Sequence, residues 1–169
     1  MAAMLMGAWS LQSCEPTKEV WLDEFGQDSC YVQDWGMLEV NRSVVHTPLT
    51  VNGVVYERGL GAHSISRLLY DLDGKAVSIS GLAGADDKNL FAGKLQFKIL
   101  GDKKELWKSG VMQKGDPVKE FNVNLKGVDK VLLLVEECGD GIMYDHADWL
   151  NVKITTRGDV KPVPAWAKP

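Results

Sequence analysis

Short stretches in which apolar and polar residues alternate recur along most of the chain. The clearest is residues 94–100, where Leu95, Phe97 and Ile99 are separated by polar residues. Alternation with a period of two places the apolar side chains on one face of a β-strand. Further strands are predicted at residues 49–51, 54–56, 68–72, 76–82, 105–108, 121–125, 131–135 and 150–154. No segment keeps a helical period over three turns, so the pattern predicts an all-β fold.

Turn signals separate these short strands. Asn52 and Gly53 stand between residues 49–51 and 54–56, and Asn-Gly between two apolar runs is the strongest short hairpin signal. Similar signals recur about every eight to twelve residues, which is typical of a sandwich or a barrel.

The same pattern divides the chain into three parts. Residues 1–19 form an apolar N-terminus followed by a short polar linker, residues 20–157 form the folded domain, and residues 158–169, with three prolines, form a linker or tail. Residues 27–43 lack periodicity and are predicted to be a long loop that contains Trp35.

Composition limits the classes of function. A chain of 169 residues with 45% hydrophobic and 25% charged residues is expected to form one globular domain with a substantial core. Its net charge of -4 argues against nucleic acid and against an anionic membrane surface as partners. We therefore expect membrane attachment only through a lipid anchor.

The N-terminus provides the candidate anchor. Residues 2–11 are mostly apolar and too short to span a bilayer, and Leu11–Cys14 resembles a bacterial lipoprotein signal without its basic start. This interpretation predicts lipidation of Cys14 and a location in the bacterial cell envelope or outside the cell; the alternative is an apolar tail with a free thiol. In an exported protein Cys30 and Cys138 form a disulfide or remain two separate small apolar residues.

Side chains that can bind a ligand or take part in a reaction are concentrated near the C-terminus. Residues 139–149, between two predicted strands, contain three carboxylates, an imidazole and two aromatic rings. An ordinary hairpin turn needs only Gly with Asp or Asn, so this loop holds more chemistry than its geometry requires. The alternative is structural, with the aspartates capping the loop and Trp149 anchoring the sandwich.

Three segments give the chain a resemblance to a known family. It resembles the NPCBM family, also called carbohydrate-binding module family 51, in residues Leu49–Ser64, Gly84–Asp87 and Gly139–Trp149. Lesser matches are Trp21-Leu22, Trp35-Gly36 and Ser109–Met112. The resemblance implies an antiparallel β-sandwich of the jelly-roll or discoidin-like lectin type. It also implies a non-catalytic module that binds glycans, often galactose-containing, and is commonly joined to a glycoside hydrolase such as an α-galactosidase.

Five residues are the predicted ligand-binding set: Trp35, His63, Tyr144, Asp145 and His146. Imidazoles and carboxylates suit sugar hydroxyls, and an aromatic face covers the apolar C–H face of a pyranose. We expect them to lie at one end of the sandwich. The structural alternatives are a core histidine at His63 and a plug over the sandwich end at Trp35.

Four aspartates are candidate ligands for a structural calcium ion: Asp86, Asp87, Asp140 and Asp148. Calcium prefers six to eight oxygen ligands, which loops of a β-sandwich can supply jointly. A solvated turn is the alternative for the Asp86-Asp87 pair. Zinc is not expected, because the His and Cys residues lack ligand spacing.

Two other functions remain open from the residues alone. The many Asp and Glu residues allow a small glycoside hydrolase that uses paired carboxylates. A docking module with a protein partner is the second alternative, since a fold does not determine function.

Overall fold

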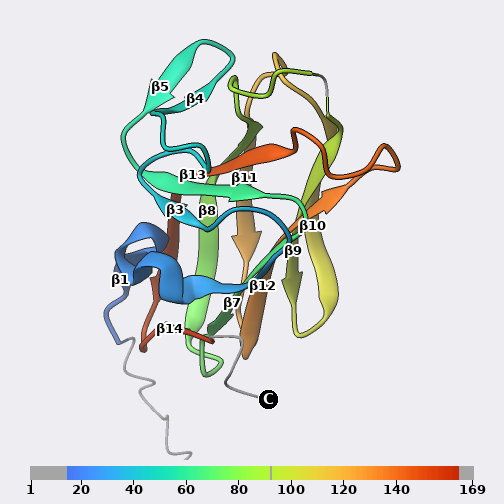
Figure 1. Ribbon diagram of the computed structural model, residues 1–169. Coiled ribbons are helices and arrows are strands. Elements are labelled where there is room, and N and C mark those ends of the chain that lie inside the picture. Colours follow the sequence, from blue (N-terminus) through green and yellow to red (C-terminus); the bar gives the residue numbers. More distant parts are fainter. Residues whose placement is uncertain (1–14, 92, 164–169) are drawn as a thin grey trace, which may run out of the picture.

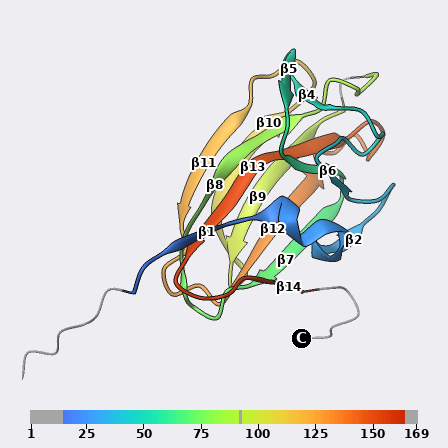
Figure 2. The same ribbon diagram turned by 90° about the vertical axis from the view of Figure 1, so that its left-hand side faces the viewer.

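The computed structural model describes residues 15–91 and 93–163, apart from the side chains of residues 30 and 31. Within these ranges the chain forms two antiparallel six-stranded sheets that pack face to face, with a separate hairpin at one end (Figures 1 and 2). The antiparallel β-sandwich predicted from the alternating pattern is therefore confirmed.

The two sheets are built from strands far apart in the sequence. Across the first sheet the order is β11 (Lys119–Asn124), β8 (Ala76–Ala85), β13 (His146–Thr156), β6 (Gly59–His63) and β3 (Glu39–Val40), with β1 (Lys18–Trp21) also pairing with β13. Across the second sheet the order is β10 (Lys104–Met112), β9 (Leu95–Gly101), β12 (Lys130–Glu137), β7 (Ser66–Asp71) and β14 (Lys161–Pro162), with β2 (Cys30–Gln33) also pairing with β7.

The core lies between the sheets and is centred on Trp149. Its ring centroid lies 4.9 Å from that of Phe97 and 5.7 Å from that of Phe121, with the ring planes almost perpendicular in both pairs. All three rings are buried. Edge-to-face packing of this kind is favourable beyond the burial of area alone. The interpretation of Trp149 as an anchor of the sandwich agrees with this packing.

A β-bulge in β13 changes which residues face the core. The pairing of β13 with β8 shifts between Leu150 and Lys153, and Asn151 has a φ of 51°. A bulge adds one residue to one strand and so reverses the inside–outside alternation beyond it. Trp149 and Val152 therefore both belong to the core, whereas Leu150 faces outward. The simple alternation predicted for residues 150–154 is corrected in this respect.

The outward Leu150 is covered by the predicted hairpin. Strands β4 (Leu49–Val51) and β5 (Val54–Tyr56) form this hairpin, and Leu49 and Val51 pack on Leu150 in a second small apolar cluster. At the turn, Asp87 accepts hydrogen bonds from the backbone N–H groups of Asn52 and Gly53, at 3.0 and 2.7 Å. The β4–β5 hairpin thus covers part of the outer face of the first sheet at one end.

The segment predicted as a loop over residues 27–43 is more ordered than its pattern suggests. It holds the end of a 3-10 helix, η1 (Leu22–Ser29), kinked at Gly26, and the short strands β2 and β3. Strands of four and two residues are too short to produce a recognisable period. Strand β13 also begins at His146, so the loop after β12 is shorter than the predicted one.

The sequence predicted lipidation at Cys14 and a folded domain that starts at residue 20. Cys14 lies outside the described residues. The folded part begins with β1 at Lys18, close to the predicted boundary at residue 20. No helix among the described residues is long and apolar enough to cross a membrane.

Candidate functional site

Two histidines lie side by side on the outer face of the first sheet. Strand β6 ends at His63 and β13 begins at His146, and the antiparallel register places these two residues directly opposite each other. Their ring centroids are 5.5 Å apart, and the residues are 3% and 7% exposed. Because side chains alternate along a strand, the neighbouring Ala62 and Ala147 enter the core and both imidazoles face outward.

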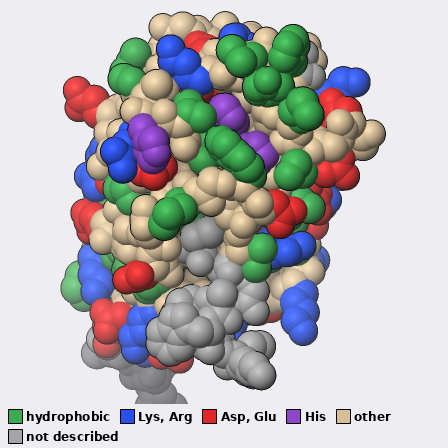
Figure 3. All heavy atoms as spheres, viewed as in Figure 1, with side chains coloured by type: hydrophobic (Ala, Val, Ile, Leu, Met, Phe, Trp, Pro, Cys, Tyr) green, Lys and Arg blue, Asp and Glu red, His purple; other side chains and the backbone are tan. Residues whose placement is uncertain are grey.

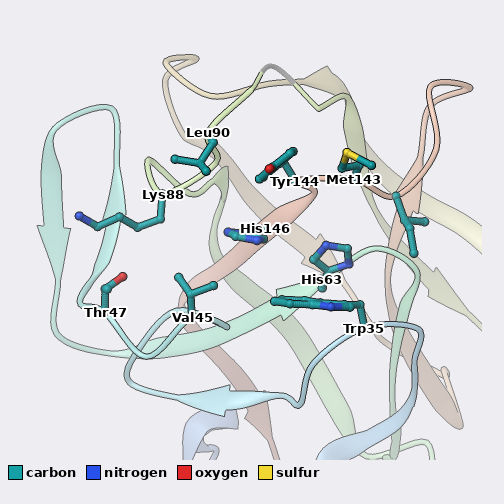
Figure 4. Close-up of a pocket in the computed structure, with 10 residues that line it drawn as sticks. Trp35, Val45, Thr47, His63, Lys88, Leu90, Met143, Tyr144 and His146 are labelled. Atoms are coloured by element: carbon teal, nitrogen blue, oxygen red, sulfur yellow. The ribbon is translucent and has the colours of Figure 1, made fainter.

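Trp35 supports both imidazoles from the loop that follows β2. Its ring centroid lies 4.9 Å from that of His63 and 5.7 Å from that of His146, and its plane is within 9° of the His146 plane. The close-up in Figure 4 shows the two imidazoles gathered on one side of the indole. Trp35 nevertheless remains 48% exposed. The three rings form an open cluster with surface left for a ligand.

Tyr144 extends this cluster from the loop before β13. Its ring lies 6.5 Å from His146 and packs edge-on against Phe91 at 4.9 Å. Its φ of 65° lies in the left-handed region, which is uncommon for a residue other than glycine and often marks a functional constraint.

Carboxylates hold the backbone of this loop in place. Glu137 Oε2 accepts hydrogen bonds from the N–H groups of Gly139 and Gly141, and Asp140 Oδ2 accepts one from Lys94. These hydrogen bonds therefore fix the backbone of the loop that carries Tyr144 at several points.

These rings border a pocket with a volume of about 670 Å³, in the range of ordinary ligand sites. It is lined by Trp35, Val45, Thr47, His63, Lys88, Leu90, Ile142, Met143, Tyr144 and His146. Figure 3 shows two neighbouring histidine patches among hydrophobic side chains near one end of the sandwich, and a third histidine apart from them beside charged side chains. None of the described lining residues is an aspartate or glutamate, so paired-carboxylate hydrolysis has no groups to use there.

Asp145 lies behind the pocket rather than in its wall. Its carboxyl group is fully buried, and its Oδ2 accepts a hydrogen bond of 2.5 Å from the hydroxyl of Ser64. Gly93 approaches so closely that a Cβ there would meet Asp145 Oδ1 at 2.5 Å. Burial raises the pKa of Asp145 to about 6. Of the five predicted residues, the other four line the pocket, and Asp145 reaches it only through Ser64 and His63.

The surroundings of the two imidazoles favour their neutral form. Burial lowers the pKa of His63, and burial together with the neighbouring His63 lowers the pKa of His146. His63 Nδ1 lies 2.6 Å from the carbonyl oxygen of Ser64. A carbonyl oxygen only accepts, so this nitrogen carries the proton and Nε2 is left as an acceptor.

Three of the four candidate calcium ligands accept hydrogen bonds from backbone N–H groups. Asp86 accepts a hydrogen bond from the Lys88 N–H at 2.6 Å, Asp87 caps the hairpin turn, and Asp140 caps Lys94. Asp148 is fully buried beside Asp86, and burial raises the pKa of its carboxyl group well above the ordinary value, with Asp86 adding to the effect. Neither carboxyl oxygen of Asp148 has a hydrogen-bond partner among the described residues. Protonation of Asp148 removes its like-charge repulsion with Asp86 without a metal ion.

No three His, Cys, Asp or Glu side chains in the described ranges are grouped so as to hold a metal ion. The calcium ion therefore stays a prediction. Cys138 is a free, half-buried thiol, which does not support the disulfide alternative.

Several lining residues were not predicted from the sequence. Lys88 and Leu90 come from the loop after β8, and Ile142 and Met143 from the loop before β13. Pairs of large apolar residues inside turns rich in Gly, Asp and Asn are unusual, and this local signal would have pointed to both loops.

Comparison with known proteins gives consistent matches. A sequence model described as the NPCBM/NEW2 domain matches residues 18–155. Alpha-1,3-galactosidase B of Akkermansia muciniphila is 29% identical over 130 residues, which cover 75% of this chain and 16% of that protein. The chain thus corresponds to a small part of this curated relative.

Solved structures show the same architecture. The CBM51 of Clostridium perfringens GH95, in complex with methyl-galactose, aligns with a TM-score of 0.72 and 25% identity over 81% of this chain and 99% of that one. The structure of the M60 catalytic domain with two CBM51 domains of Clostridium perfringens ZmpB aligns with a TM-score of 0.74 and 28% identity, covering 83% of this chain and 15% of that one.

Proposed function

Because this chain belongs to the NPCBM/NEW2 domain family, a family of carbohydrate-binding modules, we propose that its histidine-lined pocket binds a terminal galactose-type sugar. The observation that carries the proposal is the pair of facing imidazoles beside a half-exposed indole. Sugars offer hydroxyls that both donate and accept hydrogen bonds, together with an apolar C–H face. In the pocket, the imidazoles complement the hydroxyls and the indole complements the C–H face.

The imidazoles have complementary hydrogen-bonding roles. His63 Nε2 accepts from a sugar hydroxyl, because its Nδ1–H is committed to Ser64. His146 Nδ1 is buried without a hydrogen-bond partner among the described residues. A buried N–H without an acceptor is costly, which favours the tautomer with its proton on Nε2. His146 then donates to a sugar oxygen while His63 accepts.

The aromatic rings take the apolar part of the sugar. Trp35 is the platform, since half of its surface remains exposed beside the imidazoles. Tyr144 borders the same pocket and adds a phenolic hydroxyl. Asp145 acts as a positioning residue: it holds Ser64, whose carbonyl in turn fixes the His63 ring. This chain of contacts supports a preformed site.

The relatives support this assignment and suggest its setting. One structural relative is described in complex with methyl-galactose, and a curated relative is a galactosidase many times longer than the matched region. We propose that the module serves a glycoside hydrolase by holding it on galactose-containing glycans. A location in the cell envelope or outside the cell, with a lipid at Cys14, completes this proposal.

The decisive experiment is calorimetric titration with methyl-galactoside. We expect His63→Ala and His146→Ala each to weaken binding by about 1–3 kcal/mol, because a buried polar group loses its partner. His46→Ala is the matched control, since His46 is exposed, pairs with Glu39 and does not line the pocket. Folding of each variant is checked by near-ultraviolet circular dichroism. Full binding by both folded variants would refute the site.

Calcium is tested separately by thermal unfolding with and without a chelator. If calcium is a structural ligand, its removal lowers the melting temperature by the linkage between binding and folding. Asp148→Asn distinguishes the two explanations for the buried acidic pair, because it abolishes a calcium effect but preserves a neutral partner for Asp86. An unchanged melting temperature in the chelator would exclude calcium from this role.

A further inference from the structure

The first residue of β13 is held by a side chain from the loop after β8. Asn89 is fully buried, and its Oδ1 accepts a hydrogen bond of 2.9 Å from the His146 N–H. Its Nδ2 donates to the His146 carbonyl oxygen at 3.1 Å. Asn89 does not line the pocket, yet its amide binds both backbone groups of a residue that does.

The register of the first sheet explains why a side chain holds this position. Strand β8 ends at Ala85, which pairs with Ala147, so His146 extends one residue past the end of β8. The His146 carbonyl also accepts from the Asp86 N–H at 3.0 Å. Since a carbonyl oxygen has two lone pairs and an N–H one proton, both His146 backbone groups are fully used on this side. The amide of Asn89 therefore takes the place of a further peptide group of β8.

The same hydrogen bonds decide how His146 meets His63. Residues opposite each other in an antiparallel ladder form either hydrogen-bonded pairs or closer pairs without mutual hydrogen bonds. Because the backbone groups of His146 are bound to Asn89 and Asp86, His146 and His63 form a pair of the second kind. The placement of the two imidazoles therefore depends on hydrogen bonds made on the side of β13 that faces away from His63.

Asn89 also belongs to a loop that supplies pocket residues. Lys88 and Leu90, its neighbours in the sequence, both line the pocket (Figure 4). In the loop after β10, Lys114 Nζ donates a hydrogen bond of 2.8 Å to the Asn89 carbonyl oxygen. One buried residue thus connects two pocket-lining segments, and Lys114 supports it from outside the pocket.

We propose that Asn89 is a positioning residue of the sugar site and that Lys114 supports it. The inference rests on the proposed function, because the sugar is the ligand that His146 would bind. Without the Asn89 amide, the buried N–H of His146 loses its acceptor, and a buried polar group without a partner is unfavourable. The first residue of β13 then shifts, and its imidazole leaves the place opposite His63.

Calorimetric titration of Asn89→Ala with methyl-galactoside is the first test. We expect about a tenfold or greater loss of affinity, because the displaced imidazole no longer reaches the sugar oxygen. Thr156→Val is the matched control: Thr156 is also fully buried on β13, at its other end, and its hydroxyl bonds the backbone of Lys75 and Gly158. It should lower the free energy of unfolding and keep affinity within about twofold.

NMR spectra of the histidine rings separate positioning from a general loss of stability. Recorded without sugar, they should show the His146 resonances displaced in Asn89→Ala and unchanged in Thr156→Val. His46, which is exposed and lies outside the pocket lining, is the internal reference. Identical His146 resonances in Asn89→Ala and the unchanged protein would overturn the positioning role, whether or not the protein binds galactosides.

Lys114 offers a test that leaves the buried amide intact. Lys114→Met removes an ammonium group from an exposed side chain, so this variant is expected to fold. We expect about a threefold loss of affinity, and Lys114→Arg, which keeps a charged donor, should recover most of it. The control is Lys126→Met, at an exposed lysine outside the pocket lining. If Asn89→Ala does not fold, equal affinities of Lys114→Met and Lys126→Met contradict the proposal.

Two further results would contradict it. One is a folded Asn89→Ala variant with the full affinity of the unchanged protein, and the other is an equal loss of affinity in Thr156→Val. Failure of the unchanged protein to bind methyl-galactoside would instead refute the proposed function, and the NMR comparison would still test the position of His146.

Discussion

Two tryptophans stand at the centre of two aromatic clusters that have opposite surroundings. Trp149 is fully buried and meets Phe97 and Phe121 edge-on between the sheets. Trp35 is 48% exposed and meets His63 and His146 on the outer face of the first sheet. Both clusters are supported by β13, since His146 and Trp149 belong to that strand.

The difference shows how one strand serves both stability and binding. Alternation sends Trp149 inward, into the apolar core between the sheets, and His146 outward, beside an open pocket. A closed cluster gains its free energy from burial during folding. An open cluster keeps part of its area uncovered, and that area becomes available to a ligand.

The largest expected effect is on the closed cluster. Trp149→Ala leaves a cavity between the sheets and should lower the free energy of unfolding by about 3–5 kcal/mol. Denaturant unfolding measures the change, and Trp21→Ala, on the half-buried surface beside Arg58, is the matched control. A loss for Trp149→Ala no greater than that of the control would mean that the closed cluster does not organise the core.

In the open cluster, loss of the tryptophan should reduce ligand affinity rather than stability. Trp35→Ala is expected to weaken methyl-galactoside binding about tenfold or more, equivalent to about 1.4 kcal/mol, because the sugar loses its platform. The free energy of unfolding should fall by about 1 kcal/mol or less, since half the ring is already in water. Calorimetry and denaturant unfolding on the same preparation check both values. A large loss of stability with unchanged affinity would contradict the comparison.

The effect on the support beneath the open cluster depends on pH. Burial raises the pKa of Asp145 to about 6, above its ordinary value of 3.8. The folded protein therefore holds this proton more tightly than the unfolded chain, so the associated stability is present below about pH 4 and is lost as pH rises through about 6.

Asp145→Asn removes this titration, and both histidines titrate in either protein. The stability of the variant relative to the unchanged protein should therefore increase from pH 4 to pH 7.5 by about 2 kcal/mol, since each tenfold change in proton affinity is worth about 1.4 kcal/mol. Urea unfolding at the two pH values measures this difference. A relative stability that stays constant or decreases would show that Asp145 is not held in a raised-pKa environment.

Much of the fold could be predicted from local signals. The alternation of Leu95, Phe97 and Ile99 and the Asn52-Gly53 turn gave the strands and the hairpin correctly, because both are properties of adjacent residues. The bulge at Asn151 could not be predicted, since it depends on pairing with β8. Short β2 and β3 were missed for a related reason: they are defined by their partner strands, not by a period of their own.

The candidate site likewise combines features set by local sequence with features set by tertiary contacts. The sequence by itself determined the residue types, the turn positions and the direction of each side chain along a strand. Tertiary structure decided that His63 and His146 are opposite each other, that Asp145 is buried behind them, and that Leu90 and Met143 line the pocket. The physical reason is that local periodicity sets which face a residue occupies, whereas register and cover depend on contacts between segments distant in the chain.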